Sequence, residues 1–312
     1  MKEVSLKKLL PLYGAWDISE DERSVTFRDR RADEPASHGL ALVGHNIDDG
    51  SIECKVRMPT TRPSPGASVV FRANGQEKYF AAGIGGWEYA YSLFEGNNLR
   101  FTRMAGAGSN DNIVGGRDYA VKITLEGQRV VLFVDEVKVL DYRGLGRTEG
   151  AAVGLFVFKG TQEVIFSNLR VDDRRPKAFI VMQFSTPYDE VYRDAIQPLV
   201  EEMGFDPVRV DDIADPGIII SDIWTYITEA SVVIAEISEA NPNVYYEVGM
   251  AHSLRKPTLL LAKRGTHLPF DVRPHRCIFY DNSIPGRSRL QDSLRKSLEA
   301  LLGKPIIAAA AA

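Results

Sequence analysis

Cysteine, long apolar runs and an excess of basic charge are all scarce in this chain of 312 residues. Its two cysteines, Cys54 and Cys277, lie far apart, which fits neither a disulfide-rich scaffold nor a paired metal-ligand motif. No stretch approaches the roughly 20 apolar residues of a membrane span, and the first residues lack the apolar run of a secretory signal. We therefore expect a cytoplasmic protein with buried free thiols, no metal site and no membrane partner.

The charge balance is close to neutral. Thirty-eight basic and 42 acidic residues give a formal charge of −4, so no global positive field attracts nucleic acid, and we predict no nucleic-acid partner. Hydrophobic residues make up 44% of the chain and charged residues 26%, as in ordinary globular proteins. The length favours two domains. The alanine tail at residues 308–312 is excluded from both.

The first half of the chain has the pattern of antiparallel strands. Apolar and polar residues alternate over short runs separated by turns with glycine or asparagine; examples are residues 51–58, 67–72, 119–125 and 129–135. No apolar helical stripe longer than about ten residues interrupts these runs. We therefore predict an antiparallel β-sandwich of jelly-roll type over residues 1–172.

The spacing of apolar residues changes after residues 172–177, a charged run that contains a proline. Residues 178–182 form an apolar run typical of a buried strand, and a helical stripe from Val191 to Met203 follows and ends at Gly204. Further strands are expected at 205–210, 231–237, 257–262 and 277–280, and helices near 218–230, 243–254 and 287–302. This alternation predicts an α/β doubly wound (flavodoxin-like) parallel-sheet domain over residues 173–307.

In such a sheet, ligands bind at the carboxyl ends of the strands, and two loops leave from that edge. The loop after the first strand contains Gln183 and Phe184. The loop after the strand at 231–237 leads to Asn241-Pro242-Asn243, a turn and N-cap signal, so we expect Glu247 about one turn into a helix, facing the strand ends. We expect the positive end of the helix dipole to keep this carboxylate ionised.

Asp222 is expected near the start of the preceding helix. Two carboxylates that converge from adjacent helix starts suit cleavage of an N-glycosidic bond, because one faces the ribosyl carbon as it becomes positive while a second polar group holds the ribose. Glu247 is the candidate for the first role, and Asp222 or Asn241 for the second. The alternative is that Glu247 only compensates the helix dipole, and periodicity does not decide between them.

Residues 179–184, 222–227, 233–236 and 241–252 together resemble the nucleoside 2-deoxyribosyltransferase-like family, which is allied to the TIR-type NAD-cleaving domains. The resemblance covers residues 177–282 and implies an enzyme in which Glu247 attacks the anomeric carbon, Asp222 contacts the base or orients the site, and Asn241 binds the sugar. Family members commonly carry an aspartate at the position of Glu236. The substrate-binding candidates are Asn241, Asn243, Gln183, Phe184, Glu236 and Arg209. Arg209 would meet a phosphate or, equally, form a surface salt bridge.

The leaving group favours NAD or a related nucleotide as the small-molecule substrate. Nicotinamide leaves as a neutral base, whereas a natural nucleobase leaves poorly unless it is protonated, and no acid is evident near Glu247. No resident cofactor is predicted. Family analogy implies a bacterial defence effector that acts as a homo-oligomer. The alternative function is a non-catalytic sensor or scaffold that binds a nucleotide without turning it over.

Segments 14–17 and 168–171, near the first and last strands of the sandwich, resemble the concanavalin A-like, LamG-type sandwiches, and the resemblance covers residues 12–172. It implies a glycan or protein ligand. The Glu-x-Asp-x-x-Glu arrangement of laminarin-type glycoside hydrolases is absent from the sequence. The hypothesis that the sandwich is a glycosidase therefore predicts paired carboxylates elsewhere on its concave face. The aromatics that would line a groove or else fill the sandwich are Tyr79, Phe80, Trp87, Tyr89, Tyr91 and Phe94.

Overall fold

The computed structural model describes residues 1–28, 38–60, 65–86, 88–146, 148, 150–158, 163–209 and 220–302. The chain divides into two compact units: the first comprises Met1–Leu125 and Arg129–Arg174, and the second begins at Arg175 and includes Glu126–Gln128. Each unit has its own sheet structure and its own apolar core. Trp87, Val210 and the alanine tail, which the sequence analysis singled out, lie outside the described residues.

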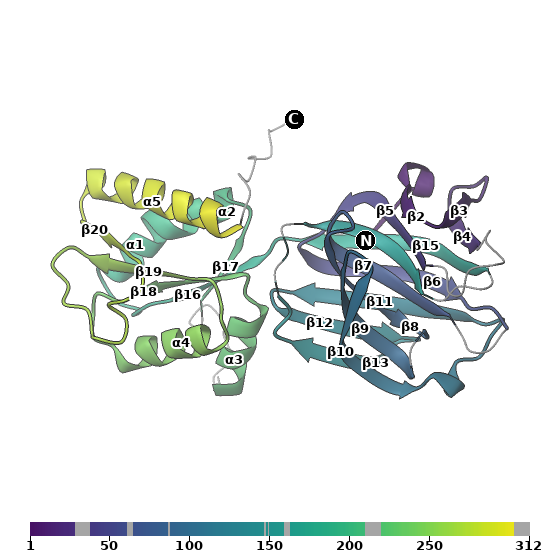
Figure 1. The fold of residues 1–312 in the computed structure, drawn as a ribbon. Helices are drawn as coiled ribbons and strands as arrows, with labels where there is room; N and C mark the ends of the chain where they lie inside the picture. The colour runs from purple at the N-terminus through teal and green to yellow at the C-terminus, as the bar shows by residue number, and fades with distance from the viewer. Residues whose placement is uncertain are drawn as a thin grey trace. The chain divides into compact units, whose positions relative to one another are not determined.

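The first unit is an antiparallel β-sandwich, as predicted (Figure 1). One sheet has the strand order β13-β12-β11-β6-β15-β4-β3, with β1 also paired to β15. Its strands are β1 (Lys2–Glu3), β3 (Ala15–Ile18), β4 (Ser24–Arg28), β6 (Asp49–Arg57), β11 (Asp118–Glu126), β12 (Arg129–Val134), β13 (Val137–Arg143) and β15 (Val164–Arg174). We call it the first sheet.

The second sheet has the order β10-β9-β8-β7-β14-β5-β2. Its strands are β2 (Leu10–Tyr13), β5 (His38–Asn46), β7 (Gly66–Asn74), β8 (Lys78–Ile84), β9 (Tyr89–Asn97), β10 (Arg100–Ser109) and β14 (Ala152–Phe158). The described residues of this unit also include two 3₁₀ turns, η1 (Leu6–Lys8) and η2 (Asn110–Asn112).

The main core lies between the two sheets and follows from the alternation along each strand. In β6, Ile52, Cys54 and Val56 are buried, whereas Lys55 and Arg57 are exposed. Because successive side chains of a strand point to opposite faces, the buried set joins the inter-sheet core. Cys54 is a free thiol in this core, and burial raises the pKa of its thiol to about 12.

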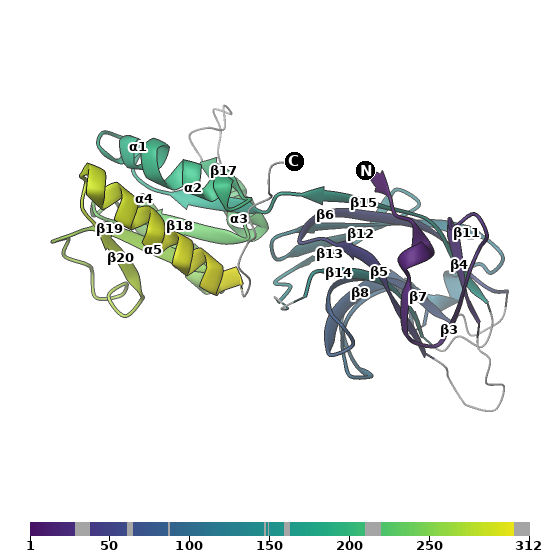
Figure 2. The same ribbon diagram turned by 90° about the horizontal axis from the view of Figure 1, so that it is seen from above.

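The opposite face of the second sheet carries a separate apolar cluster, which we call the concave cluster. Its buried members are Leu40, Val70, Ala73, Tyr79, Ala81, Phe94 and Phe156. The ring of Phe101 on β10 stacks on His38 of β5 with 5.4 Å between centroids, although β9, β8, β7 and β14 lie between those strands in the sheet. The sheet therefore curls around this face, and its curvature can be followed along β5, β14, β7 and β8 in Figure 2.

Most of the aromatic residues that were candidates to line a groove are instead packed inside the sandwich. Tyr79 and Phe94 belong to it, and Phe80 lies in the core between the sheets. A Cβ added to Gly96 would lie 2.2 Å from Cζ of Tyr79, so only glycine leaves room for this ring. Tyr89 and Tyr91 are half-buried. The concave face is thus filled by its own apolar side chains.

The second unit is built on a parallel five-stranded sheet with the order β17-β16-β18-β19-β20. Its strands are β16 (Lys177–Val181), β17 (Asp206–Arg209), β18 (Val232–Glu236), β19 (Thr258–Lys263) and β20 (Cys277–Tyr280). Its helices are α1 (Tyr188–Val191), the π-helical segment η3 (Tyr192–Ile196), α2 (Gln197–Glu202), α3 (Ile220–Glu229), α4 (Pro242–Ser253) and α5 (Ile284–Leu302). The predicted alternation of strands and helices is confirmed.

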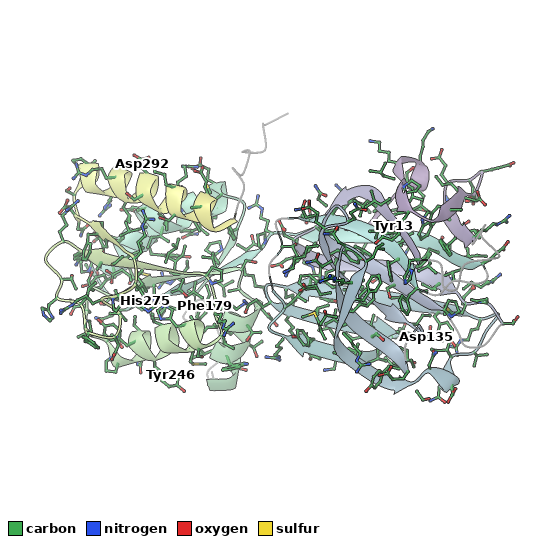
Figure 3. The ribbon with its side chains drawn as sticks, viewed as in Figure 1. Tyr13, Asp135, Phe179, Tyr246, His275 and Asp292 are labelled. Carbon is green, nitrogen blue, oxygen red and sulfur yellow. The ribbon has the colours of Figure 1, made fainter. Side chains whose placement is uncertain are left out.

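Helices cover both faces of this sheet (Figure 1). One apolar cluster joins α1, η3, α2 and α5 to alternate residues of the strands, including Ile180 and Ile234. The other joins α3 and α4 to the opposite set, including Phe179 and Ala235. Because both faces are buried, the strands are continuously apolar, as the sequence of β18 shows. In Figure 3, Phe179 lies inside the unit and Tyr246 on the outer surface of α4. None of the described helices is long and apolar enough to cross a bilayer.

Candidate active site

The carboxyl ends of β16 and β18 bring two of the predicted loops to one edge of the sheet. β16 ends at Val181 and leads into Gln183 and Phe184, and β18 ends at Glu236 and leads into α4. The two strands are neighbours, and the strand order reverses between them. In doubly wound sheets, ligands bind outside the carboxyl ends of the strands at such a reversal, which makes this edge the candidate site.

Asn241 links the two loops. Its side-chain oxygen accepts a hydrogen bond from the backbone N–H of Asn243 at 2.9 Å, which caps α4 as predicted. Its amide nitrogen donates to Oε1 of Gln183 at 3.4 Å, and Gln183 in turn donates to Oγ of Ser185 at 3.0 Å. The structure therefore brings Gln183 and Asn241 together. The long Gln183–Asn241 bond is the contact that a bound hydroxyl would most easily replace.

Glu247 lies on one flank of α4. Val244, Val248 and Ala251 pack on the sheet, and at about 100° per residue Glu247 falls on one side of this stripe while Tyr245 and His252 fall on the other. His252 stacks on His275, before β20, with 4.1 Å between ring centroids. Glu247 therefore lies on the flank of α4 opposite this pair of histidines.

The carboxyl group of Glu247 is half-buried and has no hydrogen bond or ion pair within the part of the chain that the structure describes. Burial raises the pKa of this carboxyl to about 7. The expectation that the helix dipole keeps it ionised is therefore wrong, because Glu247 lies beyond the first turn of α4, where the dipole is weak, and desolvation dominates. Near neutral pH this group exists in both protonation states.

Asp222 lies in the first turn of α3 and is exposed to solvent. Since α3 packs against α4, the helix that carries Asp222 is the neighbour of the helix that carries Glu247. The two carboxylates are thus on adjacent helices.

Glu236 is held inside the fold at the end of β18, with 3% of its surface exposed. Its carboxylate accepts hydrogen bonds from the hydroxyl of Tyr280 at 3.0 Å, from the backbone N–H of Ser238 and from the Ser238 hydroxyl. Burial raises its pKa, and the hydrogen bonds and the charge of Lys263 oppose that rise. Its oxygens are occupied, so it braces the loop after β18 rather than presenting a group to a substrate.

Arg209 is buried at the end of β17 rather than placed on the surface. Its guanidinium forms an ion pair with Asp189 at 3.1 Å and lies between two rings, 4.7 Å from the centroid of Phe184 and 4.4 Å from that of Tyr192. The sequence left open whether Arg209 contacts a phosphate or forms a surface salt bridge. The structure contains a salt bridge, but the arginine is buried. Arg209 thereby fixes Phe184 at the candidate site.

A cation at the same edge was missed by the sequence analysis. Nζ of Lys263, the last residue of β19, lies 4.2 Å from the ring centroid of Tyr188, and the hydroxyl of Tyr188 donates to Oε1 of Glu239 at 2.8 Å. The position of a lysine at the end of a buried strand is the signal that would have identified it. Within the described residues, no cluster of three or more His, Cys, Asp or Glu side chains has the arrangement of a metal site.

Comparison with known proteins found no matching family model and no matching curated protein. Among solved structures, the carbohydrate binding module CBM66 from Bacillus subtilis is 15% identical, with a TM-score of 0.45 over 55% of this chain and 98% of that one. A Bacillus subtilis protein of unknown function with a galectin-like fold is 13% identical, with a TM-score of 0.41 over 54% and 90%. The β-glucanase of Bacillus licheniformis is 8% identical, with a TM-score of 0.36 over 51% and 82%. At these scores, the β-sandwich assignment rests on the strand pairing itself.

Proposed function

We propose that the α/β unit is a flavodoxin-like, doubly wound domain that cleaves the N-glycosidic bond of NAD or a related nucleotide, with Glu247 as the nucleophile. The observation that carries this proposal is the carboxyl group of Glu247, which is half-buried, has no hydrogen bond or ion pair within the described residues, and has a pKa raised to about 7. A carboxyl that only stabilised the helix would be expected to be solvated or paired.

The chemistry follows from this environment. A carboxylate oxygen of Glu247 gives an electron pair to C1′ of the ribose while the C1′–N bond breaks, and the electron pair of that bond neutralises the pyridinium ring of the departing nicotinamide. Water then attacks C1′ of the ribosyl ester, which regenerates the carboxylate and releases one proton. The positive pyridinium of the bound substrate lowers the pKa of Glu247, so that substrate binding itself favours the reactive form.

Neighbouring residues supply binding. In this proposal Asn241 and Gln183 meet the ribose hydroxyls, Phe184 provides an apolar wall fixed by Arg209, and Asp222 contacts the sugar or base from α3. The nucleotide is a substrate, and no resident cofactor is involved. We further propose that the sandwich binds the ligand that controls the reaction, and that the protein acts as a homo-oligomer in a defence role.

The test is nicotinamide release from NAD by the full chain, with Glu247→Gln as the variant. We expect a loss of about a hundredfold or more, because glutamine keeps the shape of the side chain but is not a nucleophile. Glu201→Gln, an exposed position on α2, is the matched control and should leave the rate unchanged. Equal rates for the wild type and Glu247→Gln would refute the nucleophilic role.

The pH dependence separates a nucleophile from an acid. If Glu247 acts as a nucleophile, kcat/KM rises with pH through about 7 and reaches a plateau above it, since the free enzyme must lose the carboxyl proton. A rate that falls as pH passes 7 would show that Glu247 acts instead as a general acid.

One observation favours the second candidate function, a nucleotide sensor without turnover. His252, the histidine nearest to Glu247 on α4, lies on the other flank of the helix and stacks on His275, so it is not placed to act as an acid beside Glu247. A site without an acid holds most nucleotides without cleaving them. Thermal stabilisation by NAD or a nucleotide, with no product detected by mass spectrometry, would identify this function.

A further inference from the structure

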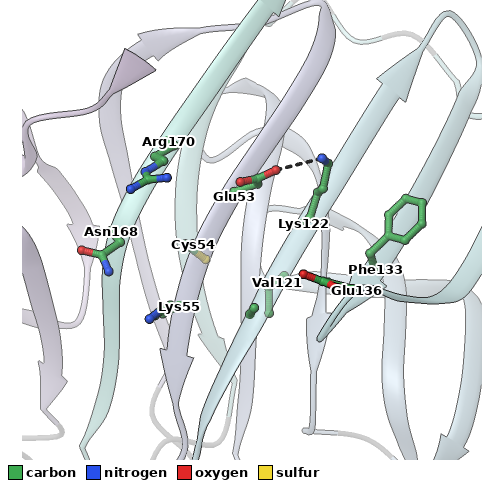
Figure 4. Close-up of a pocket in the computed structure, with 10 residues that line it drawn as sticks. Glu53, Cys54, Lys55, Val121, Lys122, Phe133, Glu136, Asn168 and Arg170 are labelled. Carbon is green, nitrogen blue, oxygen red and sulfur yellow. Dashed lines mark ion pairs between the residues drawn. The ribbon is translucent and has the colours of Figure 1, made fainter. Parts of the chain in front are cut away.

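The first sheet has a hollow on the face that points away from the core (Figure 4). It extends over β15, β6, β11 and β12 and has a volume of about 720 Å³, within the roughly 300–1,000 Å³ of ordinary ligand sites. Ala120, which pairs with Lys55 across the strands, contributes only a methyl group where the flanking positions carry long side chains. The pairing of β15 with β6 is also irregular between Ser167 and Arg170. The hollow thus follows from a small residue beside a bulge.

One end of the hollow is cationic. Lys55 and Arg170 lie there, both exposed, and neither side chain makes a hydrogen bond or an ion pair within the described residues. Lys55 lies near enough to Asp118 to contribute to the lowered pKa of that carboxyl, but the hydrogen-bonding partner of Asp118 is Arg57. By contrast, Nζ of the third cation, Lys122, is 2.9 Å from Oε1 of Glu53. Two positive charges therefore remain available to a ligand.

The other end offers a ring and an acceptor. Phe133 on β12 is half-buried and lines the hollow, and Glu136, in the turn after β12, is exposed at its rim. Figure 4 shows Arg170, Glu53, Lys122 and Phe133 in a row across the four strands. At the usual spacing of strands this row spans about 14 Å, which is the length of a short oligosaccharide rather than of a single small ion.

We propose that this hollow binds a short acidic saccharide, one whose sugar rings bear carboxylate or sulfate groups. The acidic group lies between Lys55 and Arg170, a sugar ring places its apolar face on Phe133, and ring hydroxyls reach Asn168 and Glu136. An aromatic face beside planar polar groups is suited to a sugar, whose two faces are apolar and whose rim carries hydroxyls. Lys55 and Arg170, whose side chains have no partner among the described residues, select the acidic form over the neutral one.

The concave face of the second sheet is less suited to bind a saccharide than the outer face of the first sheet. The concave face of the second sheet is occupied by the concave cluster, in which Tyr79, Phe94 and Phe156 are completely buried. A ligand would have to displace these rings and lose their packing. The outer face of the first sheet has no such cost, and the proposal is independent of the reaction proposed for the second unit.

The test is binding of trigalacturonate to the full chain by isothermal titration calorimetry, compared with its fully methyl-esterified form. The ester keeps every ring and hydroxyl but removes the charge, so we expect it to bind at least tenfold more weakly. Arg170→Gln and Lys55→Gln should each weaken binding of trigalacturonate about tenfold, and Phe133→Ala should weaken both forms. A sulfated chondroitin disaccharide in the same assay distinguishes sulfate from carboxylate recognition.

Arg100→Gln is the matched control, because Arg100 is an exposed arginine on the second sheet with no ion pair within the described residues. It should bind like the wild type. Thermal unfolding of each variant identifies any that fail to fold, and Lys55→Gln replaces Arg170→Gln in that case. Equal binding of acid and ester, equal loss in Arg100→Gln, or no binding of either the uronate or the sulfated sugar would overturn the proposal.

Discussion

Two glutamates of the α/β unit differ in their surroundings although burial raises the pKa of both. Glu236, at the end of β18, is inaccessible, and its oxygens accept hydrogen bonds from Tyr280 and Ser238. Glu247, on the flank of α4, is only half-buried and has no such partner within the described residues. A carboxyl that is satisfied stabilises its loop, whereas one that is desolvated but unsatisfied is a cost to the fold. A raised pKa is thus common to both glutamates, and the hydrogen-bond partners of the carboxyl group distinguish Glu236 from Glu247.

The largest effect on stability should come from removing the satisfied group. Glu236→Ala leaves the Tyr280 hydroxyl and the Ser238 N–H without their acceptor, and we expect a loss of about 2–4 kcal/mol in the free energy of unfolding. Urea denaturation measures it. Glu236→Gln, which retains an acceptor oxygen, should lose much less. A Glu236→Ala protein as stable as the wild type would remove the distinction between the two glutamates.

Replacing Glu247 should increase the free energy of unfolding, whereas replacing Glu236 should decrease it. Its pKa is about 7 in the folded state and near 4.5 in the unfolded state, so the unfolded chain binds fewer protons between those values and stability falls as pH rises through that window. Glu247→Gln cannot ionise and should be more stable than the wild type at pH 8 by about 1–2 kcal/mol, after discounting for its partial exposure. At pH 4 the two proteins should unfold alike. Chemical denaturation at the two pH values checks this, and a constant difference would contradict it.

The smallest loss of stability is expected from removing one hydrogen-bond donor to Glu236. Tyr280→Phe removes one of the hydrogen bonds to Glu236 while keeping the ring, and we expect a loss of about 1 kcal/mol. Its thermal midpoint, measured beside that of Glu236→Ala, shows how the bracing is divided between Tyr280 and Ser238. A loss as large as that of Glu236→Ala would assign the whole effect to the tyrosine.

Much of the architecture could be predicted from the periodicity of apolar residues. Period-two runs predicted strands such as β6 and β7, and β20 begins and ends at the predicted residues, because burial on one or both faces imposes these patterns. The N-cap at Asn241 was predicted from the identity of a few local residues. Local signals of this kind depend on nearby chain alone and are therefore visible in the sequence.

Other features depend on contacts between distant residues, which periodicity does not contain. The helix expected after β16 is interrupted by the π-helical segment η3, although its apolar stripe continues through it. Arg209 is buried between Phe184 and Tyr192, and a charged residue at a strand end gave no sign of that. The pKa of Glu247 was mispredicted because desolvation depends on what packs around α4. The candidate site residues were selected by type and position, but the sequence did not indicate their environments.

The second sheet of the sandwich lies between two apolar layers, the inter-sheet core on one side and the concave cluster on the other. Its central strands β7, β8 and β14 are thus shielded from water across both faces, and their amides are bonded to neighbouring strands on either side. In heavy water these amides should be the last of the sandwich to take up deuterium. We therefore expect the slowest amide exchange of this unit in the second sheet, which is covered by apolar side chains on both faces, and not equally in the two sheets that enclose the main core.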